Sequence, residues 1–461
     1  GLAAFDRHTG RPLWRTSARH SFIHNGIAVG GGRVYCLDRL PKSAETKAAR
    51  KGHVPGTYRI AAFDLRTGRT LWEQTNAVFG TWLSYSKEHD LLLQAGASGA
   101  DRLKDEARGG IAVLRAKDGR EVWRNDSIKY SGPCILYHGL ILTTPASYRP
   151  SAGAFSLLDG KIHCITNPLT GDLQPWRVYR TYGCNTPVAS ENLMTFRSGA
   201  AGFYDLAGHG GTANLGGFKS GCSANLIVAN GVLNAPDYTR TCSCPYQNQT
   251  SLALVPMPEA ELWTCNFAGF DTPPGRRVRR VGLNFGAPGD RLDDGTLWLE
   301  YPPTPGPSPR LPIAIQPANT LPFRRHASTV SGDGPAWVFA SGLRDIESVK
   351  ISLTTPKTEN PATAPAAEAQ PRTLQSARYT VRLYFLEPDP VAPGQRVFDV
   401  VLQGRPSLAA FDVVAAAGSA DRGIVREFKN IVADDELHLR LQKSPASSLG
   451  PILSGIELRL E

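Results

Sequence analysis

One hairpin pattern recurs along the first half of the chain and constrains the fold more than any other feature. Residues 61–72 read AAFDLRTGRTLW, and residues 4–14 read AFDRHTGRPLW. In each copy an apolar strand runs into Asp-x-x-Thr-Gly, where Asp can accept hydrogen bonds from turn amides and Gly tolerates a positive φ. The returning strand ends in Trp, and a large ring at a fixed repeat position is best packed between neighbouring sheets.

The tryptophans that close each copy give the period of the repeat. Trp14, Trp72, Trp123 and Trp176 lie about 50 to 60 residues apart. Looser copies of the pattern occupy residues 112–123 and 165–176, and weaker marks stand at residues 202–206 and 252–263. Since two further strand candidates fit between marks, the unit is four short strands, which predicts a propeller blade.

These marks resemble the PQQ-like β-propeller repeat, which is found in quinoprotein dehydrogenases and in an outer-membrane assembly lipoprotein. The resemblance covers residues 1 to about 270, and it implies that each Trp docks one blade on the next. The sequence of residues 182–250 is similar to the sequences of a group of such propellers in planctomycete-type bacteria. Because the marks are fewer than the seven or eight blades usual in the family, we expect a partial propeller that is N-terminally incomplete.

The composition changes after Trp263. A basic run at 276–280 leads into Asn284-Phe285-Gly286, and strand-like segments follow at 336–339, 379–386, 396–402, 436–441 and 452–460. The segments 379–385 and 395–400, with the closing 455–458, resemble a malectin-type β-sandwich, a carbohydrate-binding fold. We therefore expect an all-β chain: propeller at 1–270, basic linker at 271–280, and sandwich at 281–461 with Pro-rich loops at 302–322 and 355–372.

Composition limits the partners. The formal net charge is +10, and the basic run could contact a polyanion, but a solvated linker is the favoured interpretation. No nucleic-acid-binding module accompanies the charge. No run of 18 apolar residues occurs, so we expect no membrane span, and no signal peptide is visible.

The eight cysteines point to an oxidising compartment, periplasmic or extracellular. We expect disulfides among Cys184, Cys222, Cys242 and Cys244. Zinc is disfavoured, since Cys242-Ser243-Cys244 is C-x-C and no His pair follows. Buried free thiols are the better interpretation for Cys36 and Cys134.

The segment 180–250, where the repeat pattern fails, holds the candidate catalytic and binding residues. A polysaccharide lyase needs a base such as Tyr or His and a cation for the uronate carboxylate. The residue types that fit are Tyr182, Arg197, His209, Asp237, Tyr238 and Arg240. Asn185, Asn248 and Gln249 are candidate ligand-binding residues. A glycosidase needs two carboxylates across a cleft, and Asp205 and Asp237 are the candidates for such a pair. The favoured alternative is a structural role, in which these polar side chains form the hydrogen bonds of a tight loop.

In the malectin-like part, Asp294, Tyr301 and Tyr384 are candidate ligand-binding residues, because the resemblance implies sugar recognition by aromatic rings and a carboxylate. The aromatic pair of the family is missing from the short loop at 386–390, and Tyr384 has a core position as its alternative. The quinoproteins stack their cofactor on a disulfide of adjacent cysteines beside calcium. This chain has neither an adjacent pair of cysteines nor a calcium-ligand pattern, so we expect no PQQ, no other cofactor and no metal site.

Together these features predict a binding or scaffold protein of the cell envelope or exterior, with carbohydrate or an envelope protein as partner and without catalysis. A carbohydrate-active enzyme, either a lyase or a glycoside hydrolase with its site in the propeller, is the alternative. A quinoprotein-like oxidoreductase is a weaker one, since fold and function separate freely.

Overall fold

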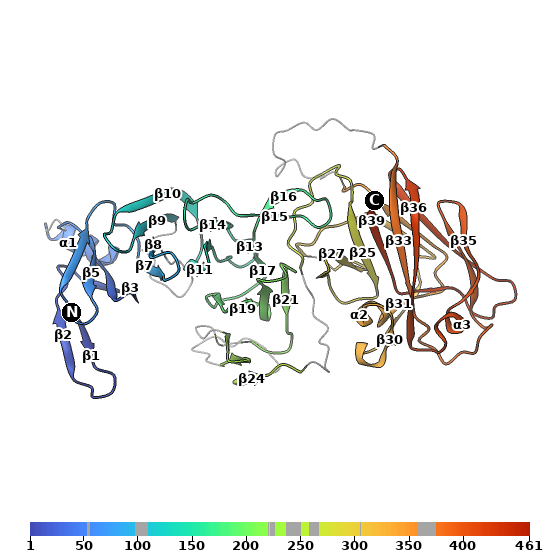
Figure 1. Cartoon of the computed structure of the whole chain (residues 1–461), viewed down its shortest axis with the longest axis horizontal. Coiled ribbons are helices and arrows are strands. Elements are labelled where there is room, and N and C mark those ends of the chain that lie inside the picture. Colours follow the sequence, from blue (N-terminus) through green and yellow to red (C-terminus); the bar gives the residue numbers. More distant parts are fainter. Residues whose placement is uncertain are drawn as a thin grey trace. The chain divides into compact units, whose positions relative to one another are not determined.

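A computed structural model describes residues 1–52, 56–96, 109–219, 221, 226–236, 250–257, 267–304, 306–356 and 375–461. They belong to two structural units. Unit 1 comprises residues 1–165, 175–206 and 216–254, and unit 2 comprises residues 166–174, 207–215 and 255–461. Both units are built almost entirely of β-strands (Figure 1), so the predicted all-β class is confirmed.

Unit 1 is a succession of small antiparallel sheets. In chain order the strands of these sheets are β1 (Leu2–Phe5) and β2 (Pro12–Thr16); β3 (Phe22–Gly30), β4 (Arg33–Asp38), β5 (Arg59–Asp64) and β6 (Thr70–Gln74); β7 (Trp82–Ser86), β8 (Leu91–Ala95), β9 (Gly109–Arg115) and β10 (Glu121–Lys129); β11 (Ile135–Tyr137), β12 (Leu140–Leu142) and β14 (Ala154–Ser156); β18 (Val188–Ala189), β19 (Leu193–Ser198) and β20 (Ala200–Asp205); and β22 (Ile227–Ala229), β23 (Val232–Ala235) and β24 (Leu252–Leu254). The 4-stranded sheets are the blades that the repeat predicts.

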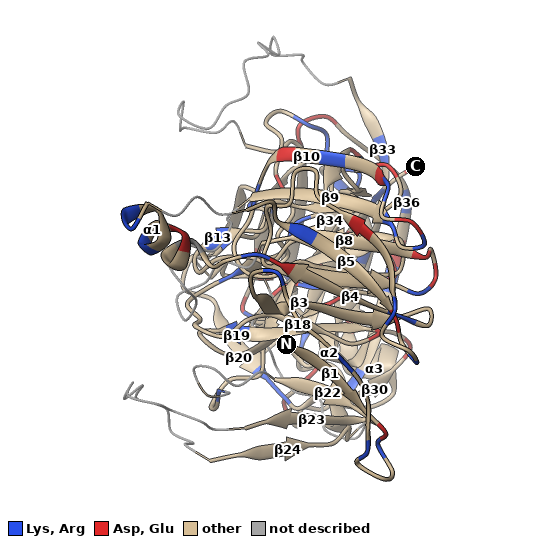
Figure 2. Cartoon of the chain, turned by 90° about the vertical axis from the view of Figure 1, so that its left-hand side faces the viewer, with Lys and Arg blue, Asp and Glu red and all other residues tan. Residues whose placement is uncertain are grey.

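Shorter elements accompany these sheets. β13 (Arg149–Pro150) pairs with β17 (Tyr179–Arg180), and β15 (Cys164–Thr166) and β16 (Leu173–Pro175) flank a short segment of unit 2. Helix α1 (Lys42–Arg50) connects β4 to β5 and was not expected from the sequence. Figure 2 shows both acidic and basic residues on α1, among them Glu45 and Lys47.

The repeat turn has the geometry that its sequence predicts. The Oδ1 atom of Asp64 accepts hydrogen bonds from the backbone N–H of Arg66, and from the N–H and hydroxyl of Thr67, at 3.0, 2.8 and 2.8 Å. The backbone hydrogen bond from Thr67 is the main reason that the pKa of Asp64 lies below its ordinary value. Gly68 follows at φ +70°, a conformation that other residues adopt at a cost.

The tryptophans join consecutive sheets. The indole N–H of Trp14 donates to the backbone oxygen of Leu65, that of Trp72 to Ala116, and that of Trp123 to Leu157, at 2.9, 3.0 and 2.8 Å. Each ring also covers the turn glycine of the following sheet, because a Cβ added at Gly68, Gly119 or Gly160 would lie 2.6 to 2.8 Å from the ring of Trp14, Trp72 or Trp123. The docking of one blade on the next, which the repeat family implies, is therefore present.

The cores of unit 1 lie between sheets. One cluster combines Tyr35 and Ile60 with Leu92 and Leu114, and so joins the second sheet to the third. The next clusters join the third sheet to the fourth and the fourth to the fifth. Since every core is shared by two neighbours, each sheet is stabilised mainly by the sheets beside it in the chain.

Unit 2 is a β-sandwich. One sheet has the order β26 (Arg291–Asp293), β27 (Thr296–Tyr301), β25 (Arg280–Phe285), β39 (Gly455–Leu460), β33 (Ala377–Phe385), β36 (Arg422–Ala433) and β30 (Ser331–Gly332). The facing sheet has the order β28 (Ile313–Gln316), β32 (Ser348–Ser352), β37 (Glu436–Lys443), β34 (Val397–Leu402) and β35 (Arg405–Asp412). Phe385 contacts Phe398 and Phe411 across the sandwich, with ring centroids 5.9 and 5.0 Å apart.

The remaining elements of unit 2 are short. They are β21 (Thr212–Asn214), a sheet of β29 (Leu321–Arg324), β31 (Ser341–Arg344) and β38 (Ile452–Leu453), the 3-10 helix η1 (Ala327–Thr329), and helices α2 (Ala336–Phe339) and α3 (Val413–Ala417). The sequence predicts a strand where α2 forms. A short apolar run fits either element, and Pro335 precedes the first helical residue.

Two segments that were predicted to be irregular take part in unit 2. Strand β28 lies inside the Pro-rich stretch 302–322, at the edge of its sheet, where proline nearby is tolerated. The basic run is also part of this unit: Val278 is fully buried and Arg280 opens β25. Most of the second Pro-rich stretch, 355–372, lies outside the described residues, because the structure does not describe residues 357–374.

Candidate functional site

Two neighbouring segments of unit 1 build an aromatic surface. The short pairing of β13 with β17 places Arg149 opposite Arg180. The chain on either side is held by Ser147, whose hydroxyl donates to the oxygen of Gly183 at 2.8 Å and accepts from its N–H at 3.1 Å. This arrangement brings Tyr148 and Tyr182 together, with ring centroids 6.4 Å apart and an interplanar angle of 38°.

Both tyrosine rings present surface to solvent. Tyr148 is 73% exposed and Tyr182 is 44% exposed, which is unusual for neighbouring large rings. Tyr148 also has a positive φ of 58°, a conformation that is uncommon for an aromatic residue and costs free energy. The backbone N–H of Tyr148 donates to the oxygen of Arg180 at 3.0 Å and helps to fix this conformation. We call this pair the Tyr148–Tyr182 surface.

Two buried guanidinium groups lie behind this surface. The Arg197 guanidinium carbon lies 4.9 Å from the centroid of the Tyr182 ring, a cation–π distance. Arg180 and Arg197 are 5% and 1% exposed. Only glycine fits at position 183, because an added Cβ would lie 2.2 Å from Nη2 of Arg180 and 2.1 Å from the backbone oxygen of Arg197.

The charge of Arg180 is poorly compensated. Burial, and then the nearby charge of Arg197, lower the pKa of Arg180 to about 10, while Cys184 raises it. Its Nη1 atom donates to the oxygen of Asn185 at 3.0 Å, but its Nε and Nη2 atoms are buried without a hydrogen bond. Among the described residues, no carboxylate pairs with Arg180, so this part of unit 1 favours an anionic group nearby.

The candidates of the segment 180–250 have different places. Tyr182 and Arg197 lie together, as above. The buried Asn185 holds the loop, since its Oδ1 atom accepts the N–H of Arg197 at 2.8 Å. His209 has φ 54° and lies in the stretch of unit 2 at 207–215. The remaining candidates fall outside the described residues, namely Asp237, Tyr238, Arg240, Asn248 and Gln249.

One carboxylate of this segment lies away from the arginines. Ala201 is opposite Arg197 on the neighbouring strand, and Asp205 follows four residues later along β20. At about 3.3 Å per residue, Asp205 is roughly 13 Å from that position. Asp205 therefore does not share the site of Arg197, and the second carboxylate considered, Asp237, lies outside the described residues.

The cysteines are partly described. Cys36, Cys134, Cys164 and Cys184 are free thiols, and the sulfur of Cys184 lies 3.6 Å from the hydroxyl oxygen of Tyr182. The prediction that Cys184 takes part in a disulfide is therefore wrong for this structure. The other three candidates, Cys222, Cys242 and Cys244, lie outside the described residues, as does Cys265, so a disulfide among those candidates stays a prediction.

The candidates of unit 2 do not form one site. Tyr384 is buried; its hydroxyl donates to Glu457 at 3.0 Å and its ring contacts Trp298 edge-on, so it is a core residue with no ring face for a ligand. Asp294 is exposed and pairs with Arg280 at 3.2 Å. Tyr301 ends the strand that Asp294 precedes, so the two are roughly 20 Å apart along β27.

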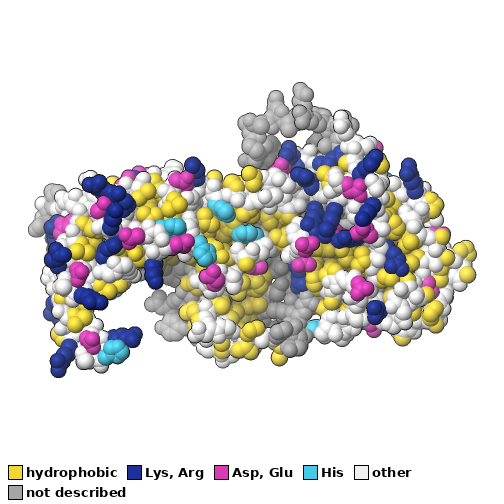
Figure 3. Space-filling model, in the orientation of Figure 1, with side chains coloured by type: hydrophobic (Ala, Val, Ile, Leu, Met, Phe, Trp, Pro, Cys, Tyr) yellow, Lys and Arg dark blue, Asp and Glu magenta, His cyan; other side chains and the backbone are white. Residues whose placement is uncertain are grey.

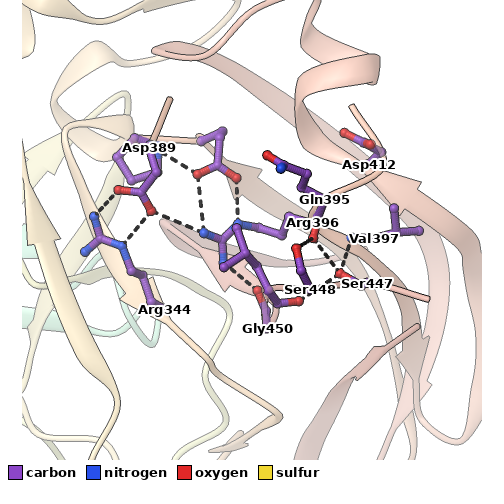
Figure 4. Close-up of polar contacts among 12 residues, drawn as sticks. Arg344, Asp389, Gln395, Arg396, Val397, Asp412, Ser447, Ser448 and Gly450 are labelled. Atoms are coloured by element: carbon purple, nitrogen blue, oxygen red, sulfur yellow. Dashed lines mark hydrogen bonds and ion pairs between the residues drawn. The ribbon is translucent and has the colours of Figure 1, made fainter. Parts of the chain in front are cut away.

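The loop that follows β33 is filled by charged residues of the protein itself (Figure 4). Arg396 donates to the fully buried Glu387 at 2.6 Å and to Asp389 at 3.2 Å. Asp389 also accepts two hydrogen bonds from Arg344, at 2.9 and 2.8 Å. This network explains Glu387 and Asp389 as structural residues of the sandwich.

The basic residues over β25, β39 and β33 are also paired. Figure 3 shows them beside acidic residues on this face of unit 2. Arg459 bonds Glu457 at 2.7 Å, and Arg382 bonds Glu427 at 2.7 Å. Positive charge is thus neutralised locally on this face of unit 2.

Comparison with known proteins gives two partial matches. Residues 1–130 match the family model described as outer membrane protein assembly factor BamB, and residues 369–450 match the malectin domain. The chain thus carries a PQQ-like repeat region followed by a malectin domain. The predicted resemblance of both parts is confirmed.

Individual relatives are distant or short. A nodulation receptor kinase of Pisum sativum is 36% identical over 81 residues, 17% of this chain and 8% of that protein. The structure of BamB from Moraxella catarrhalis is 16% identical, with 49% of this chain and 58% of that chain covered and a TM-score of 0.31. The ANX2 ectodomain from Arabidopsis thaliana is 15% identical, covers 46% and 57%, and has a TM-score of 0.29. This chain spans less than two thirds of each of these proteins.

The described residues contain neither a metal-binding cluster nor a membrane-spanning helix. No group of three or more His, Cys, Asp or Glu there is placed to hold a metal ion. No helix there has the length and apolar character needed to cross a membrane.

Proposed function

We propose that this chain is a binding protein of the cell envelope or exterior that recognises carbohydrate through the Tyr148–Tyr182 surface. The observation that carries the proposal is the pair of exposed rings above buried Arg197 and Arg180. Exposed rings can stack on the apolar face of a pyranose, and the buried charge of Arg180, which no described carboxylate compensates, favours a sugar with a carboxylate. The malectin match at residues 369–450 lies in unit 2, and it supports carbohydrate as a partner class of the chain as a whole.

Catalysis is not needed to explain this geometry. The positively charged groups lie beneath the rings, where they stabilise the loop and set the local potential. A lyase would use the Tyr182 hydroxyl as its base and Arg197 as its cation. A lyase requires the phenolic oxygen of Tyr182, whereas binding requires only the ring. The two functions can therefore be distinguished by removing that oxygen.

The test is a glycan array with the full chain and three variants. We expect Tyr148→Ala and Tyr182→Ala each to weaken binding of the retained glycan roughly tenfold, about 1.4 kcal/mol for a stacked ring. Phe5→Ala is the matched control, because Phe5 is an exposed ring of unit 1 at 57% in another sheet. Unchanged binding in both tyrosine variants would refute the proposal.

Tyr182→Phe separates binding from catalysis. This variant keeps the ring and removes the hydroxyl, so a binding protein retains its affinity. Release of unsaturated or reducing ends from acidic polysaccharides by the wild-type chain, abolished in Tyr182→Phe, would replace the binding function by a lyase.

A further inference from the structure

The thiol of Cys184 differs in its surroundings from the other described thiols. Cys36 and Cys134 are buried, Cys164 is exposed, and Cys184 is partly buried. A thiol reacts when its sulfur is accessible and its surroundings favour the thiolate, as a nearby cation or hydrogen-bond donor does. Exposure alone would make Cys164 the more reactive thiol, so the groups around the sulfur of Cys184 determine whether that order is reversed.

A buried cation lies against the turn that carries Cys184. Nη1 of Arg180 donates to the backbone oxygen of Asn185 at 3.0 Å. On the other side of Cys184, a Cβ added at Gly183 would lie 2.2 Å from Nη2 and 3.0 Å from Cζ of Arg180. The guanidinium group therefore lies beside both chain neighbours of Cys184, and the charges of the two side chains interact.

The hydrogen-bond donors of this cation are not all used. Arg180 is 5% exposed, and its Nε and Nη2 atoms are buried without a hydrogen-bond partner among the described residues. A buried donor without a partner costs free energy, and an anionic oxygen placed beside it would remove that cost. The turn thus holds donors for an anion next to a partly exposed sulfur.

A second donor approaches the sulfur from the surface. The hydroxyl oxygen of Tyr182 lies 3.6 Å from Sγ of Cys184, and an O–H group donates more strongly to a thiolate than to a thiol. The turn that presents both side chains is held in place. Gly199 donates to the backbone oxygen of Tyr182 at 2.6 Å, and Ser147 bonds the backbone of Gly183 in both directions. Cys184 therefore lies between a buried cation and a surface hydroxyl before any oxidant arrives.

We propose that Cys184 is an oxidation site for hydrogen peroxide and that Arg180 holds the anion that forms. The thiolate sulfur attacks one peroxide oxygen, an S–O bond forms and the O–O bond breaks. The second oxygen leaves as hydroxide and takes the proton of the new sulfenic acid, which gives sulfenate and water. A second peroxide reacts in the same way and gives sulfinate and another water. Cysteine is thus oxidised and peroxide is reduced.

The unused donors of Arg180 select this product among the possible modifications of Cys184. The oxygens of a sulfinate carry negative charge and can accept from the Nε–H and Nη2–H groups, which makes strong, charge-assisted hydrogen bonds. A mixed disulfide with a small thiol would leave these donors unused, because its sulfur is a weak acceptor. The proposal concerns the chemistry of one thiol and does not depend on carbohydrate binding.

The test compares thiols within the full chain. After treatment with hydrogen peroxide, peptide mass spectrometry should show that Cys184 gains two oxygens roughly tenfold faster than Cys164, although Cys164 is the more exposed thiol. Cys36 and Cys134 report on the fold in the same sample, because buried thiols should stay unmodified until the chain unfolds. Oxidation of Cys164 as fast as Cys184, or faster, would overturn the proposal.

A substitution of the buried cation identifies the group responsible. We expect Arg180→Met to lower the oxidation rate of Cys184 to that of Cys164. Arg149→Met is the matched control, because Arg149 is exposed and lies opposite Arg180 on the neighbouring strand, and it should leave the rate unchanged. Where Arg180→Met exposes Cys36 to oxidation, Arg180→Lys takes its place, since it keeps a cation and removes the Nε and Nη2 donors. A wild-type rate at Cys184 in the folded variant would overturn the role of Arg180.

Tyr182→Phe tests the second donor at the surface. This variant keeps the ring and loses the O–H group, so the oxidation rate of Cys184 should fall about threefold, the effect of one weak hydrogen bond. No glycan is present in these measurements. A failure of array binding in Tyr148→Ala or Tyr182→Ala and a failure of peroxide oxidation at Cys184 are therefore separate results.

Discussion

The indole N–H of Trp72 donates a 3.0 Å hydrogen bond to the backbone oxygen of Ala116, 44 residues later in the chain. The ring of Trp72 covers Gly119 in the same turn. One side chain thus holds the end of one sheet to the turn of the next. The same relationship recurs for Trp14 and for Trp123.

Two substitutions of Trp72 should separate the contribution of its indole hydrogen bond from the contribution of its ring packing. We expect Trp72→Phe to lower the free energy of unfolding by about 1 kcal/mol, because it keeps an aromatic ring and loses one hydrogen bond. Trp72→Ala should cost about 3 kcal/mol, because packing is lost as well. Urea unfolding measures both values. Equal values for the two variants would show that the ring itself contributes little.

The turn glycines provide a matched pair. Gly10 and Gly68 have the same φ of 70°, but an added Cβ meets nothing within 4 Å at Gly10 and the Trp14 ring at 2.6 Å at Gly68. We expect Gly10→Ala to cost about 1 kcal/mol for the backbone alone. Gly68→Ala should cost about 1 to 3 kcal/mol more, since the ring must move. Comparable losses in the two variants would contradict the docking geometry.

Acid should weaken unit 2 through Asp389. The hydrogen bond from Arg344 is the main cause of a pKa for Asp389 below its ordinary value. A carboxylate with a lowered folded pKa stabilises the fold above its unfolded pKa, about 3.9, and this contribution is lost as the pH falls through the folded pKa. The free energy of unfolding, measured by denaturant titration, should therefore decline below about pH 4.

Arg344→Met should make that decline shallower, because the pKa of Asp389 then returns toward its unfolded value. Arg422→Met is the control: Arg422 is exposed and has no ion pair or hydrogen bond through its side chain in the described residues. A profile for Arg344→Met that keeps the wild-type slope would exclude this pair as a source of acid sensitivity.

Thiol labelling should follow burial. Burial raises the pKa of Cys36 and of Cys134 to about 12, so neither thiol ionises near neutral pH and both should resist iodoacetamide until the protein unfolds. Cys164 is exposed and should be labelled in the native protein. Mass spectrometry of the labelled, unreduced chain reads out these three sites. Rapid native labelling of Cys36 would show that its sheet opens easily.

Most of the architecture could be predicted from the sequence, because each repeat turn is specified by residues that are close together in the chain. Asp64 and Gly68 specify their turn within a few residues, and the period of the tryptophans specifies how turns recur. Helix α2 was missed for the opposite reason, since Ala336 to Phe339 is too short for a period and its buried side, Val338 and Phe339, is chosen by the sandwich.

The candidate site was predicted only in part. Tyr182 and Arg197 were selected by residue type, and the structure brings them together. Tyr148 was missed because it lies outside the irregular segment; its position beside Tyr182 depends on the pairing of β13 with β17.

The tryptophan contacts have a consequence for how unit 1 unfolds. Each contact links only consecutive sheets, so the stability of the unit is the sum of nearest-neighbour couplings, as in a one-dimensional array. Breaking one coupling divides the array into two segments that can lose structure independently. Native-state hydrogen exchange in Trp72→Ala should then show two cooperative populations, one on each side of the junction between β6 and β9, in place of a single one.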